Sequence, residues 1–124
     1  MATSDVKGLG YYMFEKSLIQ AITNLNQISS LMRTTEDPAA KRCLSACDVE
    51  YTDIIDNLHL AVVQLNSNAF TKSVSTGNAA ILTYWNCERS FGNELTKPRS
   101  PITKINHDFF QLVTIAINIV QTLE

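Results

Sequence analysis

Apolar side chains recur along this chain at alternating steps of three and four residues, and this spacing limits the possible folds more than any other feature. Between Asp5 and Arg33 the recurring positions are Phe14, Leu18, Ala21, Leu25, Ile28 and Met32. Such steps bring side chains to one face of an α-helix, whereas a half-buried strand would alternate. The segment therefore predicts a long amphipathic helix, with Thr3, Ser4 or Asp5 as its N-cap.

A second helix is predicted from Asp37-Pro38 to about Asn66. Asp caps a helix start, and Pro at the first helical position gives up no needed hydrogen bond. The seam of this helix, meaning the line of residues facing the core, is Leu44, Cys47, Tyr51, Ile54, Leu58, Ala61 and Leu65, with Ile55 and Val62 widening the stripe. The polar residues 66–68 that follow predict a short turn.

Two further helices are predicted, one from about Ala69 to Phe91 and one after Ser100-Pro101, a second cap-plus-proline start. The seam of the third helix is Phe70, Ser73, Gly77, Ala80, Tyr84, Cys87 and Phe91, and Gly92 fits the left-handed position after its end. Small residues in its first half allow another helix to approach closely. The last helix carries Ile105, Phe109, Leu112, Ala116, Ile119 and Leu123, with a second apolar edge at Phe110, Val113, Ile117 and Val120.

These elements predict an all-α fold, an antiparallel up-and-down four-helix bundle that forms one domain over residues 1–124. Only four Gly and three Pro are present, fewer turn residues than an all-β domain of this length needs. The net charge of −2 argues against a nucleic-acid partner, which calls for a basic face. The most apolar stretch, Phe109 to Val120, contains polar residues and is too short to span a membrane.

Three cysteines leave at least one without a partner inside the chain. Cys47 and Cys87 lie twenty residues before and after Ser67, both on seams, so a chain that doubles back at Ser67 sets their sulfurs level. Cys43 lies one helical turn away, roughly 6 Å out of level, so any bridge pairs Cys47 with Cys87 and leaves Cys43 spare. From geometry alone, a disulfide and two reduced thiols that merely pack are equally open.

No residue pattern indicates catalysis, a metal site or a cofactor. His59 and His107 fall on different helices without carboxylates or thiolates at ligand spacing, which predicts two surface side chains. Cys43 has no base beside it, and the serines lack the context of a nucleophile elbow. The remaining function is surface contact with another protein. Trp85 lies one position beyond the seam, where it either anchors an interface or, as we favour, shields the boundary with the second helix.

Four segments resemble the plant invertase and pectin methylesterase inhibitor family, and in particular a subgroup of invertase inhibitors that includes plane-tree pollen allergens. The segments are DVKGLG at residues 5–10, DPAAKRCLSACDVEY at 37–51, AAILTYWNCERSF at 79–91 and SPITKINHDFFQL at 100–112. The last segment is the most specific. Typical members of the family begin their apolar final helix with Ser-Pro, then Thr-Lys, then Asn and Asp. The resemblance covers nearly the whole chain.

The resemblance implies a four-helix bundle preceded by a helical hairpin, with a disulfide between the second and third helices at Cys47 and Cys87. The hairpin, its two cysteines and the signal peptide of family members are absent from this sequence, which suggests a truncated product or a fragment. Family members act in the cell wall or the vacuole, which implies an extracellular, apoplastic or vacuolar location. A chain that started at Met1 would instead be cytosolic, where the bridge forms poorly.

The resemblance also implies a binding partner, a plant carbohydrate-active enzyme. Invertase inhibitors use a Pro-Lys-Phe motif at the turn between the second and third helices; Phe70 matches it, but Asn68 and Ala69 replace the other two residues. Pectin methylesterase inhibitors lay outward helix faces across the enzyme's cleft. The matching positions are Asp48, Thr52, Asp56, Lys72, Ser75 and Asn86. Any solvated helix face has similar residues, and core packing explains Phe70 equally well.

The favoured function is therefore steric inhibition of pectin methylesterase, since the departure from the turn motif weakens the case for invertase. Inhibition of acid invertase is the alternative within the family. An alternative of another class is a helical bundle without inhibitory activity, such as an allergen-like interaction protein or a truncated relic.

Overall fold

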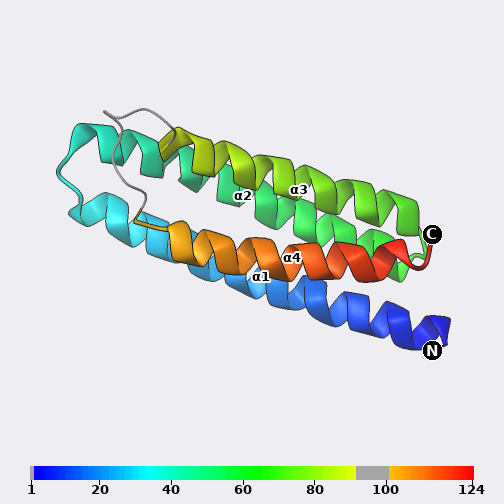
Figure 1. The fold of residues 1–124 in the computed structure, drawn as a ribbon. Helices are drawn as coiled ribbons and strands as arrows, with labels where there is room; N and C mark the ends of the chain where they lie inside the picture. Colours follow the sequence, from blue (N-terminus) through cyan, green and yellow to red (C-terminus); the bar gives the residue numbers. More distant parts are fainter. Residues whose placement is uncertain (1, 92–100) are drawn as a thin grey trace.

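The computed structural model describes residues 2–91 and 101–124 and contains four α-helices in this part of the chain. They are α1 (Thr3–Thr34), α2 (Pro38–Asn66), α3 (Phe70–Phe91) and α4 (Thr103–Gln121). The helices run antiparallel to their neighbours, with α1 and α3 each packed against both α2 and α4 (Figure 1). Both ends of the chain and the α2–α3 turn lie at the same end of the bundle. The predicted antiparallel four-helix bundle is confirmed.

The start of α2 follows the predicted capping chemistry. Asp37 is the N-cap, its side chain accepts a hydrogen bond from the Ala39 backbone N–H at 3.2 Å, and Pro38 is the first helical residue. The predicted caps of α1 are wrong. The N-cap lies one to three residues earlier than predicted: Ala2 occupies this position without a side-chain hydrogen bond, and Thr3 is already helical.

The predicted start of α4 is also wrong. Pro101 lies in a turn, and the helix begins at Thr103 with Ile102 as its N-cap. Ile102 is buried, and its carbonyl accepts a hydrogen bond from the Asn106 backbone N–H at 2.9 Å. Burial of an apolar side chain therefore sets this helix start in place of the proline. The predicted positions of Gly92 and Ser100 lie outside the described residues.

The predicted seams of the first three helices match the observed core. All seven seam residues of α2 are buried, as are six of the seven in α3 and four of the six in α1. In α4 the sequence predicted two apolar edges without deciding between them, and the buried residues come from both. Its buried residues are Asn106, Phe109, Val113, Ala116, Ile117 and Val120, whereas Ile105, Leu112, Ile119 and Leu123 are only half-buried. The hydrogen bonds of the buried Asn106, described below, fix the rotation of α4 about its own axis.

Glycines permit close helix contact at two places in the core. A Cβ on Gly77 of α3 would lie 2.7 Å from Ile117 Cγ1 of α4, and a Cβ on Gly10 of α1 would lie 2.9 Å from Val120 Cγ2. Both distances are shorter than van der Waals contact. The prediction that another helix approaches the first half of α3 is confirmed, and this helix is α4.

Two glycine substitutions are expected to have opposite effects on stability. Gly8→Ala should raise the free energy of unfolding by about 0.5–1 kcal/mol, because a Cβ there meets nothing within 4 Å and Ala favours the helix. Gly77→Ala should lower it by about 1–3 kcal/mol, because Ile117 must move. Denaturant unfolding of both variants measures the difference. A Gly77→Ala protein as stable as Gly8→Ala would contradict the packing described here.

Candidate functional site

A disulfide fastens α2 to α3 in the half of the bundle away from the α2–α3 turn. Cys47 and Cys87 are both fully buried, their sulfurs are bonded at 2.07 Å, and their Cα atoms lie 4.7 Å apart. The predicted pairing is confirmed, with Cys43 as the free cysteine. Cys43 is half-buried, and its thiol donates a hydrogen bond to the Ser90 carbonyl at 3.0 Å.

Two hydrogen bonds continue this attachment towards the α2–α3 turn. Ser73 Oγ, which is buried, donates to the Ala61 carbonyl at 2.8 Å, and Thr76 Oγ1 donates to Gln64 Oε1 at 2.7 Å. The disulfide and the Ser73 bond join residues nearly equidistant from the turn, so α2 and α3 are fixed level with one another. Surface residues on the two helices consequently keep a constant spacing.

Three of the predicted binding residues share one stripe of α3. Lys72, Ser75 and Asn86 are exposed and, with Ala79 and Leu82, follow steps of three and four residues. Leu82 is 65% exposed in the middle of this stripe. The stripe therefore has an apolar centre and polar ends.

A parallel stripe lies on the outward side of α2. Predicted Asp56 belongs to it, together with the exposed residues Val49, Asp53, Leu60 and Val63. The spacing again alternates between four and three, so the five side chains cover about 20 Å of one helix face. We call the two stripes the α2–α3 face, which comprises Val49, Asp53, Asp56, Leu60, Val63, Lys72, Ser75, Ala79, Leu82 and Asn86. The exposure of its apolar members Val49, Leu60, Val63 and Leu82 was not predicted, although their positions off the seam already indicated that they face solvent.

Predicted Asp48 and Thr52 lie on a different edge of α2, towards α1. Asp48 is half-buried and accepts a hydrogen bond from Ser29 Oγ of α1 at 3.2 Å. Thr52 Oγ1 donates to the Asp48 carbonyl at 3.0 Å within its own helix. The structure thus brings Asp56, Lys72, Ser75 and Asn86 into one surface and leaves Asp48 and Thr52 beside the α1–α2 groove.

Acidic side chains give the α2 side of this surface its charge. Asp53 and Asp56 are exposed, and Glu50 lies half-buried one turn before them. Burial raises the pKa of Glu50, and the neighbouring Asp53 carboxylate raises it further. Glu50 therefore takes up a proton at a higher pH than an isolated glutamate, which reduces the negative charge under acidic conditions.

Phe70 begins α3 at the end of the α2–α3 turn. Its side chain is half-buried and packs against the core, so the packing role considered from the sequence is present. The turn itself places Asn68 in a left-handed conformation with φ of 62°. The rest of the Phe70 side chain is exposed to solvent at the turn end of the bundle.

Trp85 lies against α4, and its predicted position at the boundary with α2 is wrong. The ring centroids of Trp85 and Phe110 are 5.6 Å apart, and those of Trp85 and Tyr84 are 5.0 Å apart. Phe110 also stacks on Tyr84 at 5.2 Å. Contact with Phe110 places the Trp85 ring on the α4 side of α3, where the side chain remains 43% exposed.

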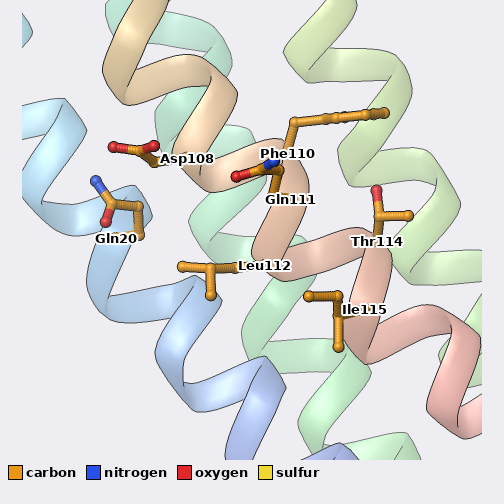
Figure 2. A pocket seen from close by; sticks show the side chains of 7 residues that line it. All are labelled: Gln20, Asp108, Phe110, Gln111, Leu112, Thr114 and Ile115. Atoms are coloured by element: carbon orange, nitrogen blue, oxygen red, sulfur yellow. The ribbon is translucent and has the colours of Figure 1, made fainter.

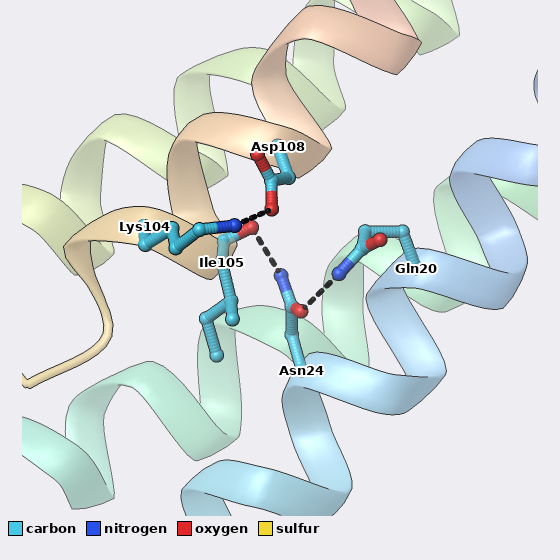
Figure 3. Close-up of polar contacts among 5 residues, drawn as sticks. All are labelled: Gln20, Asn24, Lys104, Ile105 and Asp108. Atoms are coloured by element: carbon cyan, nitrogen blue, oxygen red, sulfur yellow. Dashed lines mark hydrogen bonds and ion pairs between the residues drawn. The ribbon is translucent and has the colours of Figure 1, made fainter.

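A buried chain of polar side chains crosses all four helices. Gln20 donates to Asn24 at 2.8 Å, and Asn24 Nδ2 donates to the Ile105 carbonyl at 2.9 Å (Figure 3). Asn24 Nδ2 also donates to the Tyr51 hydroxyl at 3.0 Å. Tyr51 donates in turn to Asn106 Oδ1, and Asn106 Nδ2 donates to the Glu88 carboxylate at 2.6 Å. Asn24, Tyr51 and Asn106 are fully buried. The apolar periodicity did not predict this network, since it treats polar residues as surface.

Alkaline pH is expected to weaken the fold through Tyr51. Burial raises the pKa of this phenol far above its ordinary value near 10, and the Glu88 carboxylate adds to the increase while the hydrogen bond from Asn24 opposes it. Above about pH 10 the unfolded chain loses this proton while the folded chain keeps it, so stability falls as the pH rises, by up to about 1.4 kcal/mol per pH unit. Denaturant unfolding from about pH 8 to 11 should show a shallower decline for Tyr51→Phe than for wild type. Equal declines would contradict this role.

A groove of about 640 Å³ is lined mainly by residues of α4 (Figure 2). Its lining residues are Gln20, Asp108, Phe110, Gln111, Leu112, Thr114 and Ile115. Its one carboxylate, Asp108, is paired with Lys104 at 3.3 Å. The groove therefore holds no pair of groups suited to acid–base chemistry.

The described residues offer no group of three His, Cys, Asp or Glu side chains arranged to hold a metal ion. His59 and His107 are exposed, as predicted. In the same part of the chain, no helix has both the length and the apolar character needed to cross a bilayer.

Comparison with known proteins agrees with this arrangement. The sequence profile of the family described as plant invertase/pectin methylesterase inhibitor matches residues 2–119. A protein of Platanus orientalis named "Putative invertase inhibitor" is 27% identical over 121 residues, which cover 98% of this chain and 71% of that protein. The "Pectinesterase inhibitor" of Actinidia deliciosa is 31% identical over 90 residues, 73% of this chain and 49% of that protein.

A solved structure shows the same fold. The crystal structure of a pectin methylesterase inhibitor from Arabidopsis thaliana superposes with a TM-score of 0.87 and covers all of this chain and 82% of that one. The sequence identity is 22%, so this likeness concerns the fold alone. The family profile, which spans nearly the whole sequence, carries the assignment. The chain therefore belongs to the plant invertase/pectin methylesterase inhibitor family.

Proposed function

We propose that this protein inhibits a plant carbohydrate-active enzyme, pectin methylesterase, by laying the α2–α3 face across the substrate cleft. The observation that carries the proposal is the exposed apolar row of Val49, Leu60, Val63 and Leu82 on two helices fixed together by a disulfide. Exposed apolar residues gathered on one face favour a protein contact. Acidic and polar side chains lie between and beside these apolar residues, and protein interfaces contain such polar groups as well.

Rigidity of the α2–α3 pair suits a steric inhibitor. The disulfide and the bonds from Ser73 and Thr76 fix the helices before any partner arrives. Less conformational entropy is then lost on binding, which increases affinity for a given contact area. An interface of about 1,600 Å² in total would exclude a polymer from a cleft without any chemical step.

The choice of target rests on the turn and on the related proteins. Related proteins bear the names of both invertase and pectinesterase inhibitors. Asn68 and Ala69 stand where the family's invertase inhibitors have Pro and Lys, which favours pectin methylesterase. Acid invertase is the second candidate target, because Phe70 is retained and partly exposed at the turn.

The disulfide also supports an oxidising location, the apoplast or the vacuole. Structural disulfides form and persist outside the reducing cytosol. The bridge joins two fully buried cysteines, so it belongs to the packed interior rather than to an exchangeable surface pair.

Parallel inhibition assays against pectin methylesterase and cell-wall invertase at mildly acidic pH test the proposal. The purified, oxidised chain should inhibit pectin methylesterase at a lower concentration than invertase. Stronger inhibition of invertase would reverse the target assignment, and no inhibition of either enzyme would refute the proposed function.

The variant Leu82→Asp is expected to weaken inhibition about tenfold or more, because it places a charge at the apolar centre of the α2–α3 face. Ile19→Asp is the matched control, since Ile19 is 64% exposed on α1 and Leu82 is 65% exposed. Inhibition constants and melting temperatures are measured for both. If Ile19→Asp weakens inhibition as much as Leu82→Asp, the α2–α3 face is not the binding surface.

A further inference from the structure

Lys7, near the start of α1, contacts the α2–α3 turn across the end of the bundle. Its Nζ donates to the Asn66 carbonyl at 3.2 Å and to Asn68 Oδ1 at 2.9 Å. Lys7 precedes the two asparagines by about sixty positions in sequence, but all three lie at the end of the bundle where α1 begins and α2 turns into α3 (Figure 1). One ammonium group therefore links the first helix to the connection between two others.

The turn has a helix-ending geometry that leaves a carbonyl open at this point. The Asn68 N–H donates to the Leu65 carbonyl at 3.0 Å, and the Ala69 N–H donates to the Gln64 carbonyl at 2.8 Å. Together with the positive φ of Asn68, these bonds form a Schellman motif. That motif does not supply a donor for the Asn66 carbonyl, which is the atom that Lys7 contacts.

The charge of Lys7 suits this position. The carbonyl end of α2 carries partial negative charge, and a cation near it is stabilising. A hydrogen bond from an ammonium is also stronger than one between neutral groups. Asn68 is the sole non-glycine residue with positive φ in the described chain, a conformation that costs free energy in any L-residue. Lys7 thus supports the strained residue of the turn through its side chain.

We infer that Lys7 is a positioning residue for target binding: it holds the α2–α3 turn in the one conformation that presents Phe70 and the adjoining end of the α2–α3 face. The inference rests on the proposed function. Phe70 directly follows the turn, and Val63 and Lys72 are the members of the α2–α3 face that lie nearest to the turn in sequence, one before it and one after it. Movement at Asn68 would therefore displace the contact surface while the core of the bundle stays packed.

Three variants separate this role from a general loss of charge. Lys7→Met keeps the aliphatic stem and removes the donors, and Lys7→Arg keeps a donor and a charge. Lys16→Met is the matched control, because Lys16 lies on the same helix with its Nζ over the Tyr12 ring, 5.5 Å from the ring centroid. Each variant is tested for inhibition constant, melting temperature and amide hydrogen exchange by NMR.

In Lys7→Met, the amides of Asn68 and Ala69 should exchange about tenfold faster, and the inhibition constant should rise about tenfold, with core amides unchanged. Lys7→Arg should restore most of both, and Lys16→Met should match wild type. An active wild type whose Lys7→Met variant inhibits equally well would overturn the inference, as would equal weakening by Lys16→Met. If the wild-type protein inhibits neither enzyme, the proposed function itself is refuted. This outcome differs from failure of the Lys7 inference, in which the wild type inhibits but Lys7→Met does not weaken inhibition.

Discussion

Replacing Cys47 and Cys87 together by alanine is expected to lower the free energy of unfolding by about 4 kcal/mol. The bridge spans a sequence separation of 40, and closing a loop of this length removes considerable conformational entropy from the unfolded chain. Both cysteines are fully buried, so alanine also leaves a small void between α2 and α3. Denaturant unfolding of the double variant and of wild type measures the difference.

Reduced wild-type protein is the companion measurement, since it loses the bond but keeps both sulfur atoms in the core. Cys43→Ser is the control and should cost little of this stability, because Cys43 lies outside the bridge. Titration of the denatured protein without reductant should find one thiol, since three cysteines less the bonded pair leave one. Three reactive thiols would show that the bridge does not form.

Asn24→Leu is expected to cost about 3 kcal/mol, the second largest effect. Asn24 is fully buried and donates to both the Tyr51 hydroxyl and the Ile105 carbonyl. Leucine has a similar volume but no donor, so the buried Tyr51 hydroxyl and the partly buried Ile105 carbonyl each lose a donor, at about 1–3 kcal/mol for each group left unsatisfied. Gln20 also loses its acceptor, although it is only half-buried and can turn to water.

Asn26→Leu serves as the control, because Asn26 is exposed on the same helix. It should leave the free energy of unfolding within about 0.5 kcal/mol of wild type. Thermal and denaturant unfolding of both variants test the comparison. A stable Asn24→Leu protein would mean that the network can be replaced by apolar packing, as some buried polar groups can.

Much of the fold was predictable because its periodicity is simple. On α2 each helical turn from Leu44 to Leu65 carries one core-facing residue in phase, and all seven seam positions are buried as predicted. The Asp37 cap was predictable because capping is local chemistry between neighbouring residues. Cys47 and Cys87 could be predicted to lie at the same height in the bundle because each is twenty residues from the turn at Ser67. Geometry alone did not decide whether the two sulfurs form a disulfide.

The remaining features depend on contacts between distant residues. Asn106 is buried because Tyr51 and Glu88 provide its hydrogen-bond partners, and no local pattern contains that information. The same contacts fix the rotation of α4, which two apolar edges left ambiguous. Trp85 faces α4 because Phe110 is there. For the candidate site, the stripes were predictable as outward faces, but the exposed apolar residues on them, such as Leu60 and Leu82, were recognised only in the structure.

The gathering of residues 2 and 124 with the α2–α3 turn has a practical consequence for laboratory work. An affinity tag or fused reporter at either end would hang over the surface that Lys7 and Phe70 occupy and could mimic a loss of potency. Biosensor attachment is better made at the opposite end, through the exposed Glu36 between α1 and α2. Capture there leaves the proposed contact surface pointing into solution.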